Sequence, residues 1–400
     1  MKRHPKRSFD LYILTALSKG FPVFCSVLLP VMYAEKLIDA QAIGYIGATF
    51  IVFTIVGAVT VVRWLHKLAT RHVLQLAAVG VMVASCIVFA ALSIQNIALL
   101  MLAYGVMGVA SGTALSGVNA ITANMTTRGN RFKMIARLSM VADIVRVAFA
   151  LVVAGLVVLG AMKAAVALIA LFAIIFLFYA SRQESVKTNI APKITAQAIK
   201  HNRPFKFFLS LEFLDSFCSS QLFVFLPLLF LAKGYSLENS ILLQAFTFLG
   251  YMSGRWLVGI LAHRLSGLKA VGIAEIGLVV SILLILFAHS LWILYVLTFA
   301  LGLFARGTSP AIKSLAFDAL EDNQTKQGSA LHVIVGDSGS AAGQFTFGLL
   351  VAFYGEKSPF IVAMCIASII AILCIPRVVA LFRLTNSSVS PSPHLANKYS

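Results

Sequence analysis

The sequence predicts an all-α polytopic membrane protein with 12 transmembrane helices in two pseudo-symmetric six-helix bundles and both termini in the cytoplasm. Three observations predict this fold class: the composition, the length of the apolar runs, and an internal duplication. Of the 400 residues, 60% are hydrophobic and only 12% are charged, and the mean hydropathy is +0.93. A soluble globular domain does not need so apolar a composition.

The apolar runs are about 20 residues or longer, as crossing roughly 30 Å of hydrocarbon at about 1.5 Å per residue requires. The first run is too long for a removable signal peptide, and further spans follow it. We expect transmembrane helices at residues 10–34, 42–64, 73–94, 97–122, 134–160, 162–181, 207–232, 240–262, 269–289, 291–313, 329–354 and 358–381.

The two halves of the chain match each other at an offset of about 197 residues. Leu28-Leu29-Pro30 matches Phe225-Leu226-Pro227, and Gly57 matches Gly254. Later in each half, Asp143 falls opposite Asp337. A parallel repeat of this size in a membrane chain is the plan on which two-bundle transporters are built.

Basic residues set the expected orientation, because Lys and Arg are retained on the cytoplasmic side. They are concentrated in the amino-terminal segment, in alternate connections and in the loop 182–206, whereas the remaining connections carry only Lys36, Lys163, Lys233 and Lys357. Both termini are therefore expected in the cytoplasm and the protein in the cell (inner or plasma) membrane. This asymmetry also explains the net charge of +18, so no nucleic-acid partner is expected.

The same pattern divides the chain into an amino-terminal six-helix bundle (1–181), a cytoplasmic central loop (182–206), a carboxy-terminal six-helix bundle (207–385) and a tail (386–400). The tail is rich in Ser and Pro, a composition typical of disordered segments.

Ionisable residues inside the spans are the candidates for function, because each costs at least about 2.5 kcal/mol in hydrocarbon and usually faces a cavity or a partner. From the expected spans we single out Lys19, Asp143, Arg146, Glu212, Asp215, Arg255, Arg306, His332 and Asp337.

Three acids are candidates for coupling to protons: Asp337, Asp215 and Asp143. Asp143 and Arg146 are three residues apart and can form a structural ion pair on one helix face. Asp337 has Ser340 at the matching place and no such partner on its own helix. An isolated buried carboxylate can bind and release a proton in the physiological range, so Asp337 is the favoured site.

The cations are candidates for the gate or the substrate site. Lys19 and Asp215 lie at similar depths, so they can bridge the two halves, although Lys19 can also pair within its own half. Glu212 lies one turn from Asp215 on the same face, near enough to the boundary for a solvated role. Lys19, Arg146 and Arg306 favour an anionic or zwitterionic solute, unless they and Arg255 only neutralise the buried acids.

Cofactor, metal and enzyme chemistry find no support in the sequence. The cysteines lie in apolar stretches without C-x-x-C spacing, and no Walker loop or His/Glu metalloprotease spacing is present. We therefore predict no cofactor, no metal site, no enzymatic activity and no ATP-driven pumping by this chain.

Twelve spans as six plus six, a basic central loop and about 400 residues resemble the major facilitator superfamily of transporters. That family carries a Gly-x-x-x-Asp-Arg-x-Gly-Arg type turn between its second and third spans, echoed in the second half. The second copy here keeps Gly259 and Arg264, has His263 where the acid is usual, and places Gly267 one residue late. The first copy is weaker, with Val62 for the leading Gly, so the missing acids put the usual cytoplasmic-gate salt bridge in doubt.

The resemblance implies a monomeric secondary transporter that works by alternating access, driven by protons or by sodium. Its likeness to compact bacterial members favours proton-coupled export of a small organic solute. The stretch Ile144-Val145-Arg146-Val147-Ala148 lacks the Gly-x-x-x-Gly-Pro pattern of drug and proton antiporters. Proton-symport uptake, uniport, and a transport-inactive membrane sensor or scaffold stay open, as do the substrate and the stoichiometry.

Overall fold

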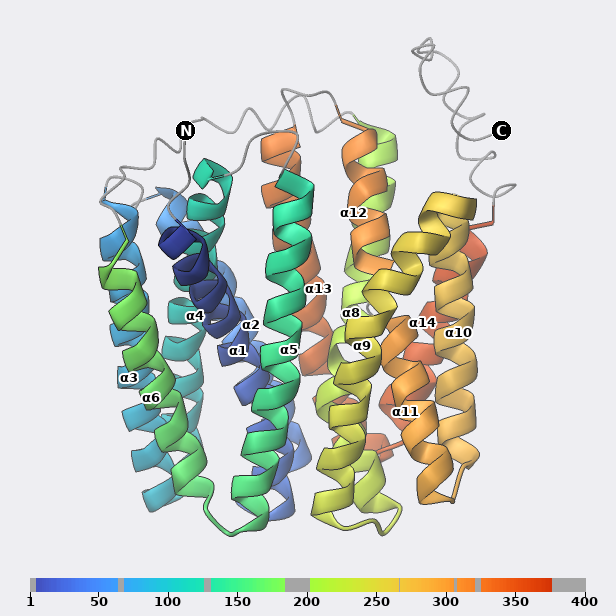
Figure 1. The fold of residues 1–400 in the computed structure, drawn as a ribbon. Helices are drawn as coiled ribbons and strands as arrows, with labels where there is room; N and C mark the ends of the chain where they lie inside the picture. Colours follow the sequence, from blue (N-terminus) through green and yellow to red (C-terminus); the bar gives the residue numbers. More distant parts are fainter. Residues whose placement is uncertain are drawn as a thin grey trace. The chain divides into compact units, whose positions relative to one another are not determined.

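The computed structural model describes residues 5–63, 68–125, 131–183, 202–265, 267–305, 308–320 and 325–375. These residues are helical almost throughout (Figure 1). The helices of the first half are α1 (Pro5–Ala34), α2 (Ala40–Arg63), α3 (Thr70–Ile94), α4 (Ile97–Met125), α5 (Arg131–Val158) and α6 (Met162–Ser181). Those of the second half are α8 (Arg203–Ala232), α9 (Leu237–Leu265), α10 (Gly267–Phe287), α11 (Leu291–Ala305), α12 (Thr308–Asp318), α13 (Thr325–Tyr354) and α14 (Ser358–Leu373).

The described helices number 13, against the 12 spans expected, and the difference lies in one of those spans. The span expected at 291–313 corresponds to α11 and α12, with two undescribed residues between them. The other expected spans each coincide with one helix, and the last extends past the described residues. The prediction of an all-helical protein is confirmed, whereas the count of 12 and the cytoplasmic termini stay predictions.

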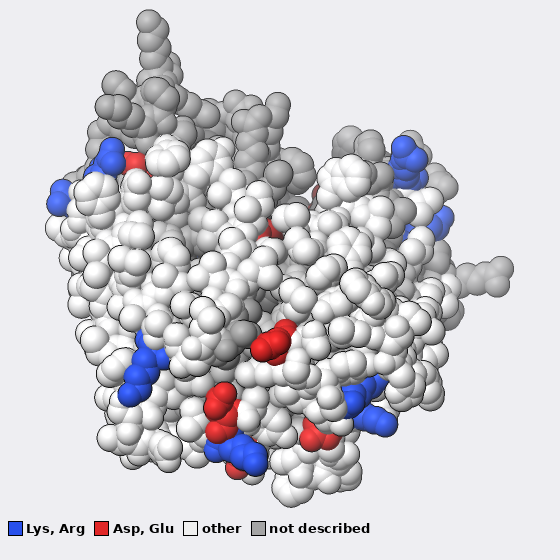
Figure 2. All heavy atoms as spheres, turned by 60° about the horizontal axis from the view of Figure 1, so that its bottom comes forward, with Lys and Arg blue, Asp and Glu red and all other residues white. Residues whose placement is uncertain are grey.

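Seven helical segments are long and apolar enough to cross a membrane. They are Phe9–Ala34, Ala40–Val61, Thr70–Ile94, Ile97–Asn119, Met162–Ser181, Arg203–Ala232 and Gly267–Phe287, and α11 and α14 are shorter apolar helices. Most of the described surface visible in Figure 2 carries no Lys, Arg, Asp or Glu side chain. Both the helices and their surface therefore fit a membrane protein.

The described residues form two compact units that do not coincide with the two halves of the sequence. Unit 1 consists of the described residues within 1–194, 221–248 and 340–358, and unit 2 of those within 195–220, 249–339 and 359–400. Helices α8, α9 and α13 thus contribute residues to both units. The predicted division into bundles at 181 and 207 stays a prediction.

Within unit 1, the most extensive helix contacts join α2 to α4, α3 to α4, α1 to α5 and α3 to α6. Helices α3, α4 and α6 lie close together in Figure 1. Small residues allow the tightest contact, because a Cβ on Gly57 of α2 would collide with the carbonyl oxygen of Val109 on α4.

The matching glycine of the second half packs in the same way inside unit 2. A Cβ on Gly254 of α9 would collide with the carbonyl oxygen of Leu303 on α11. The duplication read from the sequence therefore corresponds to a repeated packing of helices: α2 against α4, and α9 against α11.

The ends of α1 and α8 also repeat each other. At the end of α1, the N–H groups of Lys36 and Leu37 donate to the carbonyls of Tyr33 and Met32, and Lys36 has a φ of 56°. At the end of α8, Gly234 and Tyr235 donate to Leu231 and Phe230, and Gly234 has a φ of 86°. Both ends are Schellman caps with one left-handed residue, a conformation that glycine adopts without strain.

The core of unit 2 contains two apolar clusters that matter for the site. One gathers Leu211 of α8, the α10 residues Ala270, Val271 and Ala274, the α12 residues Ala311 and Ile312, and Ile370 and Cys374 at α14. The other joins Phe205 and Leu209 of α8 to Ala316 of α12. These clusters pack α8 and α12 against each other next to the acids described below.

Candidate functional site

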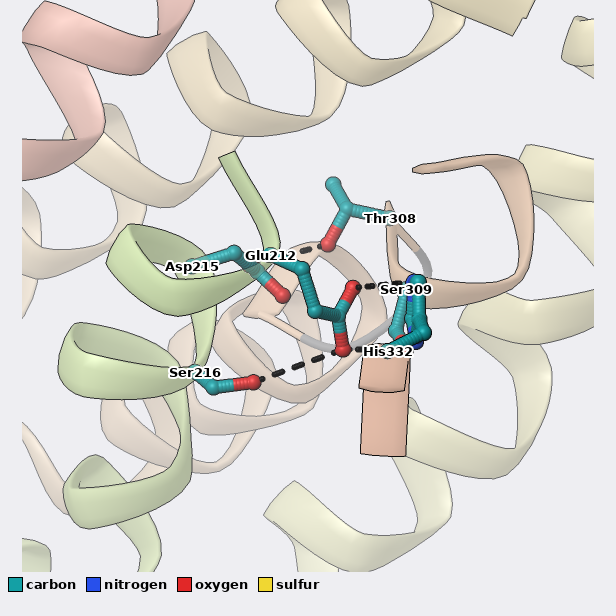
Figure 3. Close-up of polar contacts among 6 residues, drawn as sticks. All are labelled: Glu212, Asp215, Ser216, Thr308, Ser309 and His332. Atoms are coloured by element: carbon teal, nitrogen blue, oxygen red, sulfur yellow. Dashed lines mark hydrogen bonds and ion pairs between the residues drawn. The ribbon is translucent and has the colours of Figure 1, made fainter. Parts of the chain in front are cut away.

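Two buried carboxylates lie on one face of α8, inside unit 2. Glu212 is 5% exposed and Asp215 is 1% exposed. They are three residues apart and therefore project from adjacent turns of the helix. Figure 3 shows that hydroxyl groups of α12 and the imidazole of α13 surround them.

Glu212 has polar neighbours on three sides. Ser309 of α12 donates from Oγ to Glu212 Oε1 at 3.2 Å, and Ser216 donates to the same oxygen at 3.5 Å. His332 of α13 places Nε2 3.4 Å from Glu212 Oε2 (Figure 3). A Cβ on Gly336, one turn further along α13, would lie 3.1 Å from Glu212 Oε1, so a glycine there lets the carboxylate approach closely.

A cation completes the surroundings of Glu212. Lys313 of α12 is half-buried, lies 5.6 Å from the centre of the Phe317 ring, and interacts electrostatically with Glu212. The Phe317 ring also packs edge-on against His332, with 6.1 Å between ring centres. Lys313 is not among the candidates predicted from the sequence, because it lies at the edge of its expected span.

Asp215 is hydrogen-bonded to Thr308 of α12. Thr308 donates from Oγ1 to Asp215 Oδ1 at 3.0 Å, and Thr308 is fully buried. This bond gives one of the two carboxyl oxygens of Asp215 a hydroxyl donor.

A third acid, Glu275 of α10, lies close enough to Asp215 for the two carboxyl groups to share a hydrogen bond. It is 1% exposed. Glu275 is not among the candidates predicted from the sequence, although it is the single Glu within the apolar run 269–289. Asp215 is therefore part of a pair of carboxyl groups.

The other acids predicted as candidates lie elsewhere. Asp143 of α5 is buried in unit 1 and takes part in a polar interaction. Asp337 of α13 is only half-buried and has a polar interaction too, so it is not the isolated buried carboxylate that the sequence predicted. Its role in proton coupling stays a prediction.

Most of the predicted cations fall outside what can be described. The structure does not describe Arg306, nor the side chains of Arg146, Arg255 and His263. The surroundings of Gly259, from the loop motif, are also outside the description. Lys19 of α1 is half-buried in unit 1 and has a partner, while Arg264 is exposed and Gly267 begins α10. The structure thus brings Glu212, Asp215 and His332 of the predicted set together, and the bridge from Lys19 to Asp215 stays a prediction.

Unit 1 contains a close contact between α2 and α13, which are far apart in the chain. A Cβ on Gly44 of α2 would lie 2.7 Å from the Cα of Gly348 on α13, so the two backbones touch. Beside them, the amide of Gln344 donates to the carbonyl of Ile43 at 3.5 Å, and the rings of Tyr45 and Phe345 pack at 5.3 Å. This contact joins the first half of the sequence to the second.

The sequence profile described as Major Facilitator Superfamily matches residues 11–274 and 241–398. A comparison with curated protein sequences finds no significant match.

Solved structures with the same fold are numerous. A crystal structure of the nucleoside transporter NupG superposes with a TM-score of 0.75 at 12% identity, covering 94% of this chain and 99% of that one. The D-xylose-proton symporter gives 0.72 at 13% identity, with 92% and 96% covered. A POT family transporter in complex with 5-aminolevulinic acid gives 0.73 at 14% identity, with 94% and 97% covered.

At these identities the structural likeness shows the fold, and the profile match over most of the chain shows the family. The sequence, the paired glycine contacts of the two halves and the buried acids of α8 agree with both. The chain therefore belongs to the Major Facilitator Superfamily, a family of secondary transporters that span the membrane.

Proposed function

We propose that the protein is a proton-coupled transporter that moves a small organic solute across the cell membrane by alternating access, with export as the favoured direction. The observation that carries the proposal is the pair Glu212 and Asp215, both buried on one face of a membrane helix. Ionisable groups in a membrane helix are costly and mark substrate or proton pathways. Hydroxyl, imidazole and carboxyl neighbours give these two acids partners that can exchange protons with them.

The contact of Gly44 with Gly348 supports the alternating-access part of the proposal. It joins the two halves of the sequence, and transport by two bundles requires such a seam to open and close. A backbone contact with few polar bonds suits this role, because separating it leaves few unpaired groups. A sensor or scaffold does not need this seam to open.

The nature of the solute rests on weaker grounds. Nucleosides, D-xylose and 5-aminolevulinic acid appear in the names of proteins that share the fold. They suggest nucleosides, sugars and amino acids as the solutes to test. The cations inside the expected spans add organic acids to this panel. Lys313 interacts electrostatically with Glu212, so it is a described cation available to bind an anionic group near the buried acids of α8.

The test is to measure internal pH and solute uptake in liposomes that contain purified protein, while each solute of the panel is added outside. Symport acidifies the interior as solute enters, whereas antiport makes it alkaline. Asp215→Asn should abolish the pH change, and Glu238→Gln, which alters an exposed acid of α9, should not. Asp337→Asn separates the role of that residue from the role of Asp215.

Each outcome separates one alternative. Solute movement without a pH change, in the presence and absence of sodium, would indicate uniport. Movement that needs sodium would assign sodium as the coupled ion. If no solute of the panel moves while the protein is folded, the sensor or scaffold hypothesis gains support.

A further inference from the structure

Glu275 lies in a part of unit 2 that has no obvious place for a charge. Its neighbour Ala274 belongs to the apolar cluster of Leu211, Val271 and Ile312, and Glu275 itself is 1% exposed. Helix α10 is one of the segments apolar enough to cross the membrane, with Glu275 near its middle. Burying a carboxyl group there costs desolvation free energy, so we expect a compensating interaction.

Neither carboxyl oxygen of Glu275 accepts a hydrogen bond from an N–H or O–H donor among the described residues. Glu275 interacts with the Asp215 carboxyl, and it acts electrostatically on the Cys218 thiol of α8 and on the Cys374 thiol just past α14. The residues of α12 in the same cluster, Ala311 and Ile312, are apolar. The charged group that acts most strongly on Glu275 is the Asp215 carboxyl, which is itself an acid.

The partner carboxyl is placed differently. At Asp215, Oδ1 already accepts a hydrogen bond from the Thr308 hydroxyl, so a negative charge there has a donor. An ionised Glu275 would lie beside this anion without a hydrogen-bond donor among the described residues, and two adjacent carboxylates do not both ionise readily. A neutral Glu275, in contrast, can donate its own O–H to Asp215.

We propose that Glu275 and Asp215 form a proton-binding site that holds one proton, carried by Glu275 and donated in a hydrogen bond to Asp215. The site deepens the proposed function and rests on it for its role: its proton is the coupled one, bound between α8 and α10. It leaves Glu212, with its imidazole and serine partners, outside the carboxyl pair.

Infrared spectroscopy of the purified protein tests the site without any transport measurement. A protonated carboxyl group has a C=O stretching band separate from that of a carboxylate. The wild-type protein at neutral pH should show such a band, and Glu275→Gln should remove it. Glu212→Gln, the control on the neighbouring acid, should leave it in place, and Asp215→Asn should shift it because the acceptor changes.

A protein that lacks this band, or that keeps it unchanged in Glu275→Gln, overturns the proposal. Gln has nearly the shape of protonated Glu and can donate to Asp215, so the variant should fold. Thermal unfolding within a few degrees of wild type confirms this. Asp215→Asn provides an independent variant if Glu275→Gln proves unstable.

Liposomes then connect the site to coupling. Glu275→Gln should retain exchange of labelled solute between the two sides and lose at least tenfold of the accumulation driven by a pH gradient. If the band behaves as predicted but no solute moves protons, the proposed function fails and the site stands. If protons are coupled normally in Glu275→Gln, the site is not the coupling site.

Discussion

The side-chain amide of Gln244 on α9 donates to the backbone carbonyl of Phe223 on α8 at 2.6 Å. That carbonyl would normally accept the N–H of residue 227, which is Pro227 and has none. The same amide donates to the carbonyl of Ser26 on α1 at 3.5 Å, whose usual helical donor would be the N–H that Pro30 lacks. One buried amide in unit 1 thus satisfies two carbonyls that matching prolines of the two halves leave without a helical donor.

Gln244→Leu should lower the stability of the protein by about 1–3 kcal/mol, because buried carbonyls lose their donor. The measurement is thermal or denaturant unfolding in detergent. Pro227→Ala is the matched background, since an alanine at this position would supply a backbone N–H to the carbonyl of Phe223 and the loss should shrink there. An equal loss in both backgrounds would mean that the bond to Phe223 contributes little, as a double-mutant cycle would quantify.

Gly44→Ala should impair the seam between α2 and α13. The new Cβ would lie 2.7 Å from the Cα of Gly348, so the helices must move apart, and overpacking of this kind costs about 1–3 kcal/mol. We expect the transport rate to fall by roughly tenfold, the effect of about 1.4 kcal/mol on an equilibrium. Gly155→Ala on α5 is the control, because a Cβ there meets no atom within 4 Å. Equal rates in both variants would remove the seam from the transport cycle.

Thr308→Val should destabilise the site around Asp215, since valine keeps the shape of threonine and removes the hydroxyl donor at 3.0 Å. Leaving a buried charged acceptor without this bond costs about 1–3 kcal/mol. Thr308→Ser keeps the hydroxyl and should unfold at nearly the wild-type temperature. Serine and valine variants of equal stability would contradict the assignment of this bond.

Lys357→Gln should stabilise the loop end that holds Lys233. Burial, followed by the charge of Lys357, lowers the pKa of Lys233 from its usual 10.5. The charged form is therefore disfavoured by folding, and stability rises with pH through the lowered pKa up to about 10.4, the unfolded value. Lys357 is exposed and Lys233 only half-buried, so solvent screens the pair and the gain at neutral pH should be at most about 1 kcal/mol. It should appear in unfolding curves at low ionic strength and disappear at high salt.

The sequence predicted the helices and the family because both follow from local and compositional signals. Apolar runs long enough to cross a bilayer show themselves without tertiary information, and the matched prolines and glycines of the two halves reveal the duplication. Glu212, Asp215 and His332 were predicted as candidates because any ionisable residue in such a run is unusual. Glu275 met the same criterion but was not predicted as a candidate, because no neighbouring motif or matching residue in the other half pointed to it.

The hydrogen-bond partners of the buried acids could not be predicted from the sequence, because they come from helices far apart in the chain. Thr308 and Ser309 are ordinary hydroxyl residues until the packing of α12 on α8 brings them to Asp215 and Glu212. Asp337 has an interaction in the structure, which the sequence pattern of its helix did not predict.

The sequence by itself therefore determined that this protein spans a membrane as a duplicated set of helices with acids inside them, because hydropathy and repetition are properties of the chain. Tertiary structure alone decided which acid meets which donor. The protonation of a buried carboxyl depends on atoms within a few ångströms of it, and helix packing places Glu275 close to Asp215. Packing likewise places the amide of Gln244 where it donates to the carbonyls of Ser26 and Phe223.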